Sequence, residues 1–161
     1  MTPKSDAGRR IALFPGSFNP FTRGHESLVT RALSMCDGVT IAIGINIGKK
    51  DSDTESRVRA IRDLYAGDPR IDVVTYSELT GELAKRLGCA FILRGVRNTA
   101  DFEYEMNMAD VNRRLFGIET VLLTALPELA WISSSTAREL ERFGHDISEL
   151  LPSGNTPSHT K

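Results

Sequence analysis

Cysteine and histidine are scarce in this chain, and long hydrophobic runs are missing from it. The two cysteines, Cys36 and Cys89, lie far apart and form no CxxC pair, so we interpret them as small buried side chains in a reducing compartment. The three histidines show no metal-ligand spacing, and we expect no metal site built from protein ligands alone. No apolar stretch approaches the length of a membrane span, which excludes a helical membrane protein.

The chain also lacks an excess of charge of either sign. Its 20 Lys and Arg residues and 21 Asp and Glu residues leave a formal net charge of -1. Such a balance provides no global field, so we expect neither nucleic acid nor an anionic membrane as a partner. The N-terminal sequence MTPKSDAGRR has no apolar core of a secretory signal, and we predict a cytoplasmic protein. A few local cations would still suffice to bind a small phosphorylated ligand.

What the sequence does contain is a regular alternation of strands and helices. Its 161 residues fit one domain, which we place at residues 10–152, between an N-terminal extension (1–9) and a tail expected to be disordered (153–161). The predicted strands are Arg10–Phe14, Val39–Ile45, Ile71–Thr75, Ala90–Leu93 and Glu119–Ala125. The predicted helices begin near Gly24 and cover Thr54–Tyr65, Leu79–Leu87, Thr99–Phe116 and Ser133–Phe143, followed by a helical turn at Ile147–Leu151.

This alternation favours an α/β fold, a doubly wound, Rossmann-like sheet of five parallel strands with helices on both faces. The strand Val39–Ile45 is almost continuously apolar, as expected for a strand covered on both faces. Ser52 and Glu55 fit a capping box at the start of the second helix. In such a sheet, a reversal of strand order opens a crevice at the carboxyl ends of the strands. We therefore expect the functional site in the loops after strands one, two, four and five.

Groups that suit phosphate follow these four strands. Backbone N–H groups at glycines and helix N-termini, arginine side chains and hydroxyl groups all donate hydrogen bonds to phosphate oxygens. Each group alone also has a structural explanation, as a tight turn, a solvated loop or a simple helix cap. Four such groups at one edge of the sheet favour a polyphosphate site. They are PGSFNPFTRGH (Pro15–His25), Lys49-Lys50, the arginines of Arg94–Arg97, and Ser133–Ser135.

Two of these segments resemble the signatures of the nucleotidyltransferase superfamily. Thr22–His25 is similar to its (H/T)xGH motif, and ISSSTAR (Ile132–Arg138) is similar to its ISSTxxR-type motif. The stretch ILRGVRNTADFEYEMNMADVNRRL (Ile92–Leu115) resembles the RGLR…DFEYE…N block of bacterial phosphopantetheine adenylyltransferases. The resemblance to that family extends from about Ile11 to Pro152.

The resemblance implies an enzyme that transfers AMP from ATP to 4′-phosphopantetheine, giving 3′-dephospho-coenzyme A and pyrophosphate. It also implies that Mg²⁺ arrives with ATP, that the chain forms a homohexamer, and that coenzyme A acts as a feedback inhibitor. No residue of the sequence is placed as an activated covalent nucleophile, so we expect one direct in-line displacement. Catalysis would then consist of positioning and charge stabilisation.

Matching positions imply a role for each site residue. His25, Lys49 and Arg97 are implied to be catalytic. The implied ATP site consists of Ser17, Phe18 through its backbone, His25, Arg97, Tyr104, Glu105, Ile132, Ser133, Ser134 and Ser135. The implied phosphopantetheine site consists of Ser17, Lys49, Leu79, Thr80, Arg94, Met108, Asn112 and Glu139.

Some positions depart from the family pattern, and two other functions remain open. Asn19 stands where Asp is common, and Leu129 replaces an aromatic residue near the adenine. One alternative is an adenylyltransferase for another phosphorylated acceptor, such as nicotinamide or nicotinate mononucleotide. The other is a non-catalytic nucleotide-binding module. A Rossmann dehydrogenase is disfavoured, because no GxGxxG follows the first strand.

Overall fold

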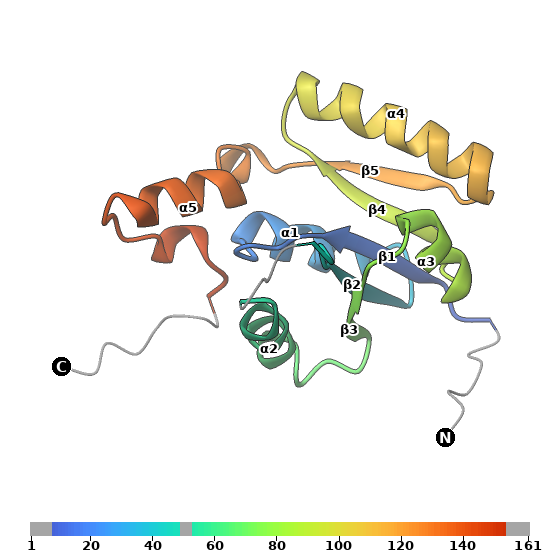
Figure 1. Cartoon of the computed structure of the whole chain (residues 1–161), viewed down its shortest axis with the longest axis horizontal. Coiled ribbons are helices and arrows are strands. Elements are labelled where there is room, and N and C mark those ends of the chain that lie inside the picture. The colour runs from blue at the N-terminus through green and yellow to red at the C-terminus, as the bar shows by residue number, and fades with distance from the viewer. Residues whose placement is uncertain (1–7, 49–52, 154–161) are drawn as a thin grey trace.

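The computed structural model describes residues 8–48 and 53–153, which form one parallel sheet flanked by helices (Figure 1). The strands are β1 (Ile11–Gly16), β2 (Gly38–Gly44), β3 (Ile71–Tyr76), β4 (Phe91–Val96) and β5 (Thr120–Thr124), in the order β3-β2-β1-β4-β5. The helices are α1 (Arg23–Ala32), α2 (Thr54–Leu64), α3 (Thr80–Arg86), α4 (Thr99–Phe116) and α5 (Ser134–Arg142), with 3₁₀ turns at Pro127–Leu129 and Ser148–Leu150. The predicted fold class is confirmed.

Helices cover both faces of the sheet. On one face, α1 and α2 pack Val29 and Ile61 against strand residues such as Ile41 in the larger apolar cluster. On the other face, α3 and the end of α4 pack against Leu13 and Ile92. Because both faces are covered, β2 is buried over nearly its whole length, which explains its continuous apolar sequence.

The order of the strands positions the crevice. From β1 the chain moves outward to β2 and β3, and then returns to place β4 on the opposite side of β1. The connections that leave β1 and β4 therefore diverge, and the carboxyl ends of these two strands border an open space. Helix α5 lies beyond this edge of the sheet, in the C-terminal part of the chain (Figure 1).

Three strands, β1, β3 and β4, run past their predicted ends, and the extensions of β1 and β4 bear on the site. β1 continues through Gly16, which pairs with Ile43 of β2. β4 continues through Val96 and includes Arg94, which pairs with Leu122 of β5. Neighbouring strands supply hydrogen-bond partners to these backbones, so pairing overrides the turn signals of the local sequence.

The helix ends agree with the predicted boundaries within a few residues. Gly117 ends α4 with φ 66°, a left-handed conformation that glycine adopts without a steric penalty. The N-cap of α2 is Asp53. Ser52, on which the predicted capping box depends, lies outside the described residues, as do most of the predicted extension and tail. Within the described ranges, none of the helices combines the length and the hydrophobicity needed to cross a membrane.

Candidate active site

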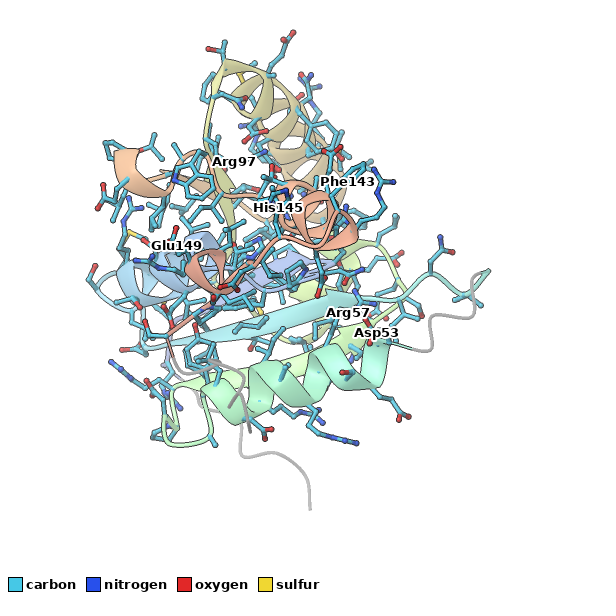
Figure 2. All side chains as sticks on the ribbon, turned by 90° about the vertical axis from the view of Figure 1, so that its left-hand side faces the viewer. Asp53, Arg57, Arg97, Phe143, His145 and Glu149 are labelled. Atoms are coloured by element: carbon cyan, nitrogen blue, oxygen red, sulfur yellow. The ribbon has the colours of Figure 1, made fainter. Side chains whose placement is uncertain are left out.

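A cleft of about 400 Å³ lies at the carboxyl ends of β1 and β4. Four segments that are distant in sequence line it. Figure 2 shows the molecule from the side of α5, with Arg97 labelled. Within these segments the lining residues are Phe14–Phe18, Thr22, Gly24, His25 and Leu28, Arg94–Arg97, and Leu129 with Ile132–Ser135; Ala125 completes the set. At the floor, Gly95 has no Cβ, and one built there would collide with the side chain of Leu28.

His25 stands in the first turn of α1, where a reciprocal capping box with Thr22 orients its ring. The Thr22 backbone N–H donates to His25 Nδ1 (2.9 Å), and the His25 backbone N–H donates to Thr22 Oγ1 (3.4 Å). Since Nδ1 accepts a hydrogen bond, the proton of the neutral ring is assigned to Nε2. The histidine of the TRGH motif therefore has its free N–H donor on the nitrogen that is not used for capping.

The surroundings of His25 keep the ring uncharged. Burial, together with the smaller effect of the positive charges of Arg94 and Arg97, lowers the pKa of His25 from 6.5 to about 4. The ring of Phe18 stands edge-on to the imidazole, with the centroids 5.0 Å apart, and Phe21 packs at 5.3 Å. Near neutral pH the imidazole is thus a neutral hydrogen-bond donor rather than a cation.

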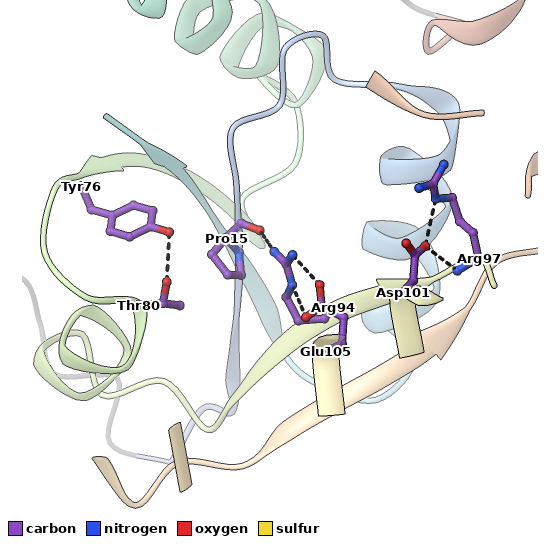
Figure 3. Close-up of polar contacts among 7 residues, drawn as sticks. All are labelled: Pro15, Tyr76, Thr80, Arg94, Arg97, Asp101 and Glu105. Carbon is purple, nitrogen blue, oxygen red and sulfur yellow. Dashed lines mark hydrogen bonds and ion pairs between the residues drawn. The ribbon is translucent and has the colours of Figure 1, made fainter. Parts of the chain in front are cut away.

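Arg94 lies at the end of β4 and is held by three hydrogen bonds (Figure 3). Its Nε and Nη2 donate to the two carboxylate oxygens of Glu105 (2.9 and 2.7 Å), and Nη1 donates to the Pro15 carbonyl (2.6 Å). Glu105 is only 6% exposed, so this ion pair is largely desolvated. Within the described part of the chain, two of the five N–H groups of Arg94 are left for an anionic ligand.

Arg97 is held more loosely at the rim of the cleft. Its Nε donates to Asp101 Oδ2 (3.1 Å), and both side chains are partly exposed. Asp101 lies in the first turn of α4, where Asn98 caps its backbone N–H (2.9 Å). Figure 3 shows the terminal nitrogens of Arg97 pointing away from Asp101. Arg97 can therefore reorient toward an anion without losing a buried contact.

The three serines at the start of α5 have different partners. Ser133 is the N-cap and accepts from the Thr136 backbone N–H (3.0 Å). Ser134 Oγ donates to the Pro20 carbonyl (2.8 Å), which ties α5 to the loop after β1. All three serines line the cleft together with the N-terminal turn of α5, which favours anions.

A second pocket of about 210 Å³ adjoins the cleft and shares Pro15, Gly16 and Arg94 with it. Residues of β3, α3 and α4 complete its walls. The hydroxyls of Tyr76 and Thr80 are 3.1 Å apart at its border (Figure 3). The other lining residues are Ile92, Tyr104, Glu105, Met108, Ala109, Asn112 and Thr120. This pocket extends from Arg94 away from His25, toward α3.

The structure brings most of the predicted site residues together in these two pockets. Ser17, Phe18, His25, Arg94, Arg97, Ile132, Ser133, Ser134 and Ser135 line the cleft, and Thr80, Arg94, Met108 and Asn112 line the second pocket. Tyr104 and Glu105, for which the family resemblance implies a place in the ATP site, also lie in the second pocket. Leu79 is 60% exposed and lines neither pocket, and Glu139 contacts Arg142 (3.8 Å) on the surface of α5. Lys49 lies outside the described residues.

Arg57 and Arg138 are site-forming residues that sequence reasoning missed. Each donates at 2.6 Å to a backbone carbonyl of the loop after β1, Arg57 to Ser17 and Arg138 to Asn19. Arg57 is next to Val58 on the stripe of α2 that faces the core. An arginine on an otherwise apolar stripe is the signal that could have identified it. Within residues 8–48 and 53–153, no group of three or more His, Cys, Asp and Glu side chains could hold a metal ion.

Comparisons with known proteins point in one direction. The model of the family described as cytidylyltransferase-like matches residues 13–140. A curated phosphopantetheine adenylyltransferase from Phocaeicola vulgatus is 52% identical over 146 residues, covering 90% of this chain and 97% of that protein. Another from Porphyromonas gingivalis is 50% identical over 147 residues, covering 91% and 96%.

Among solved structures, the chain resembles one described as a nicotinate-nucleotide adenylyltransferase from Vibrio parahaemolyticus. The TM-score is 0.58, with 21% sequence identity, and the match covers 89% of this chain and 93% of that one. At this low identity the likeness supports the α/β fold alone.

Proposed function

This chain belongs to the phosphopantetheine adenylyltransferase family, and we propose that it transfers the AMP group of ATP to 4′-phosphopantetheine. The products are 3′-dephospho-coenzyme A and pyrophosphate. One observation carries this proposal: two pockets of different character meet at Arg94. The cleft offers a neutral histidine, arginines and two helix N-termini, which suit a triphosphate. The second pocket has the mixed polar and apolar walls that suit a pantetheine arm ending in a phosphate.

The reaction is one in-line displacement at the α-phosphorus of ATP. An oxygen of the acceptor's terminal phosphate forms the new bond, the bond to the bridging β-phosphate oxygen breaks, and pyrophosphate leaves with its electron pair. The acceptor phosphate is largely ionised near pH 7, since the second pKa of such a group is about 6. The protein therefore needs no general base, and its contribution is positioning and stabilisation of charge.

Each cluster of the site has one task in this step. His25 donates its Nε2–H to an α-phosphate oxygen, where charge changes in the transition state. Arg94 uses its remaining N–H groups for the acceptor phosphate, at the junction of the two pockets. Arg97 and the N-terminal turn of α5 hold the departing pyrophosphate. Lys49, on the connection after β2, is proposed to contact the phosphates of both substrates.

Mg²⁺ is proposed to enter as part of the substrate, MgATP. This ion is small, loses its water reluctantly, and is bound through phosphate oxygens and retained waters in many nucleotide sites. The protein residues then act on the phosphate oxygens that remain. Titration of activity with Mg²⁺ at constant ATP should saturate when the MgATP complex is complete.

An acceptor panel tests the function. Pyrophosphate release from ATP is followed with 4′-phosphopantetheine, with pantetheine lacking the phosphate, and with nicotinamide and nicotinate mononucleotides. We expect release with 4′-phosphopantetheine alone, and His25→Ala under the same conditions controls for contaminating enzymes. Release with a mononucleotide instead would replace the proposed acceptor. ATP binding in calorimetry without release with any acceptor would indicate a non-catalytic nucleotide-binding module.

We also propose a homohexamer that acts in the cytoplasm. Helix α4 exposes large apolar side chains on both sides of its buried face, Phe102 and Met106 on one side and Val111 and Leu115 on the other. Such exposure is unfavourable in an isolated chain and suits contact with other copies. Light scattering after gel filtration should give six times the chain mass. Phe102→Glu with Leu115→Lys should lower this mass, whereas an unchanged mass would remove α4 from the interface.

Coenzyme A is proposed as a feedback inhibitor of the same site. It contains both the pantetheine arm and the adenosine portion of the product, so it can occupy the two pockets together. Initial rates with added coenzyme A should show inhibition that a saturating 4′-phosphopantetheine concentration relieves. Inhibition that no concentration of either substrate relieves would place coenzyme A elsewhere.

A further inference from the structure

We propose that Arg57 is a positioning residue for adenylyl transfer, which holds the Ser17–Phe18 peptide so that the Phe18 N–H faces the nucleotide cleft. This inference rests on the proposed function, because it assigns the Phe18 N–H to the phosphates of ATP. Arg57 itself lies on α2, beneath the loop that follows β1, and does not line the cleft. Its contribution is therefore made through the backbone of that loop.

The contacts of Arg57 are those of a built support. Its Nη1 donates to the Ser17 carbonyl at 2.6 Å, and its Nη2 donates to Thr54 Oγ1 at 3.1 Å. Only 9% of the residue is exposed, although arginine is rarely buried to this extent without a specific set of partners. Figure 2 labels Arg57 with Asp53 at the N-terminal turn of α2. An apolar residue at this position would pack against the core without the cost of desolvating a charge.

The peptide that Arg57 holds has an unusual conformation. Phe18 has φ 47°, in the left-handed region that residues with a side chain rarely adopt. A residue in such a region stays there only when its surroundings hold it. In a trans peptide the C=O and N–H point in opposite directions. A Ser17 carbonyl directed at α2 therefore directs the Phe18 N–H away from α2, toward the cleft that both residues line.

Neighbouring carbonyls, at the end of β1 and in the loop, are held from different directions. Arg94 binds the Pro15 carbonyl, Arg138 binds that of Asn19, and Ser134 binds that of Pro20. These three contacts come from β4 and α5, and Arg57 provides the support from α2. The Phe18 ring also packs edge-on to His25, so a shift of the Ser17–Phe18 peptide would disturb two donors at once.

A cavity of about 150 Å³ lies beside Arg57, between α2 and the loop. Phe18, Phe21 and Ile61 are among the residues that line it. Without the guanidinium, the loop has room to relax toward this space. The same space can admit a small solute from the solvent. Added guanidinium can therefore test whether the guanidinium group removed from Arg57 is needed.

The experiment compares Arg57→Met, Arg57→Lys and Arg57→Ala with Arg62→Met as a matched control. Arg62 lies on the same helix and also donates to a backbone carbonyl, that of Val73 (3.1 Å), away from the loop. We measure kcat, both KM values, ATP affinity by calorimetry, and thermal stability. Arg57→Met should lower kcat at least about tenfold and weaken ATP binding, because a preorganised donor is lost. The KM for the acceptor should change little.

Two further variants distinguish positioning from general stability. Arg57→Lys should recover part of kcat, since an ammonium can reach one carbonyl. Millimolar guanidinium chloride should raise kcat of Arg57→Ala, whereas sodium chloride at equal ionic strength should not. Arg62→Met should keep kcat within about twofold of the wild type, as expected of a substitution away from the site.

Clear outcomes would overturn the inference. These are a wild-type kcat in a folded Arg57→Met, or equal losses in Arg57→Met and Arg62→Met that follow thermal stability. If Arg57→Met fails to fold, the inference is tested by guanidinium rescue of Arg57→Ala and by the kcat of Arg57→Lys. The absence of both effects would overturn it. Rates are compared with whichever acceptor the wild type uses, so a wrong acceptor leaves this test intact. If the wild type releases no pyrophosphate, the function fails separately, and ATP affinity remains the measure for Arg57.

Discussion

The two sides of the cleft are built differently. On the side of β1 and α1, a neutral histidine sits among aromatic rings and is oriented by backbone and hydroxyl contacts. On the side of β4 and α4, two arginines provide positive charge, and each is paired with a carboxylate of α4. From this difference we infer that the side of β1 and α1 supplies a fixed hydrogen-bond donor near the reacting phosphorus. The side of β4 and α4 supplies the positive charge that binds the substrates.

The largest effect is expected when the fixed donor is removed. His25→Ala should lower kcat by about 10²–10³, the usual cost of losing one preorganised donor, with a modest change in ATP affinity. Steady-state kinetics and ATP calorimetry measure the two quantities. His145→Ala, which changes an exposed histidine on the C-terminal segment, is the control. A near-normal kcat of His25→Ala would mean that the arginines of the charged side alone stabilise the reacting phosphate.

A smaller effect is expected from the charge state of His25. Its pKa of about 4 in the folded chain lies below the ordinary 6.5, so the unfolded chain binds the proton first as the pH falls. The stability that neutral His25 contributes is complete above pH 6.5 and is lost progressively toward pH 4. By pH 5 the free energy of unfolding of the wild type should fall by about 2 kcal/mol more than that of His25→Gln. Urea unfolding at several pH values measures this difference, and parallel curves would contradict the depressed pKa.

On the charged side, Arg94→Ala should act chiefly on the acceptor. The KM for 4′-phosphopantetheine should rise about tenfold, because a charge-assisted contact to phosphate is lost. Some loss of stability should accompany it, since Glu105 would remain buried without its partner. The double variant Arg94→Met/Glu105→Leu removes both charges and separates these effects. An increase confined to the KM for ATP would mean that Arg94 binds ATP and that Arg97 binds the acceptor.

The smallest effect is expected from Arg97→Ala. This side chain is partly exposed at the rim, and its pair with Asp101 adds little to stability, about 0–1 kcal/mol. The KM for ATP should rise severalfold, and the difference from the wild type should shrink as salt is added, because exposed charges are screened. Asp101→Asn should have a weaker effect on the same KM. An effect that salt leaves unchanged would mean that Arg97 closes over the bound nucleotide.

The comparison also shows which parts of the site local sequence can predict. His25 at a helix start and Ser133 as a cap follow from neighbouring residues, because capping is a contact between residues three apart. Arg57 could not be assigned in this way. Its partner, the Ser17 carbonyl, lies 40 residues earlier, and only the packing of α2 against the loop brings the two together. The assignment of Tyr104 and Glu105 to ATP rested on resemblance, and the structure places them beside Arg94 in the second pocket.

The alternation of apolar strands and amphipathic helices was sufficient to predict the parallel sheet and the edge at which its polar segments gather. These features depend on short-range periodicity and on the handedness of the connections, which any chain with this pattern shares. Tertiary structure alone decided the charge state of His25, the pairing of Arg94 with Glu105, and the division of the site into two pockets that meet at Arg94. Each of these depends on burial and on distances between residues far apart in the sequence, and desolvation and Coulomb energies are set by those distances.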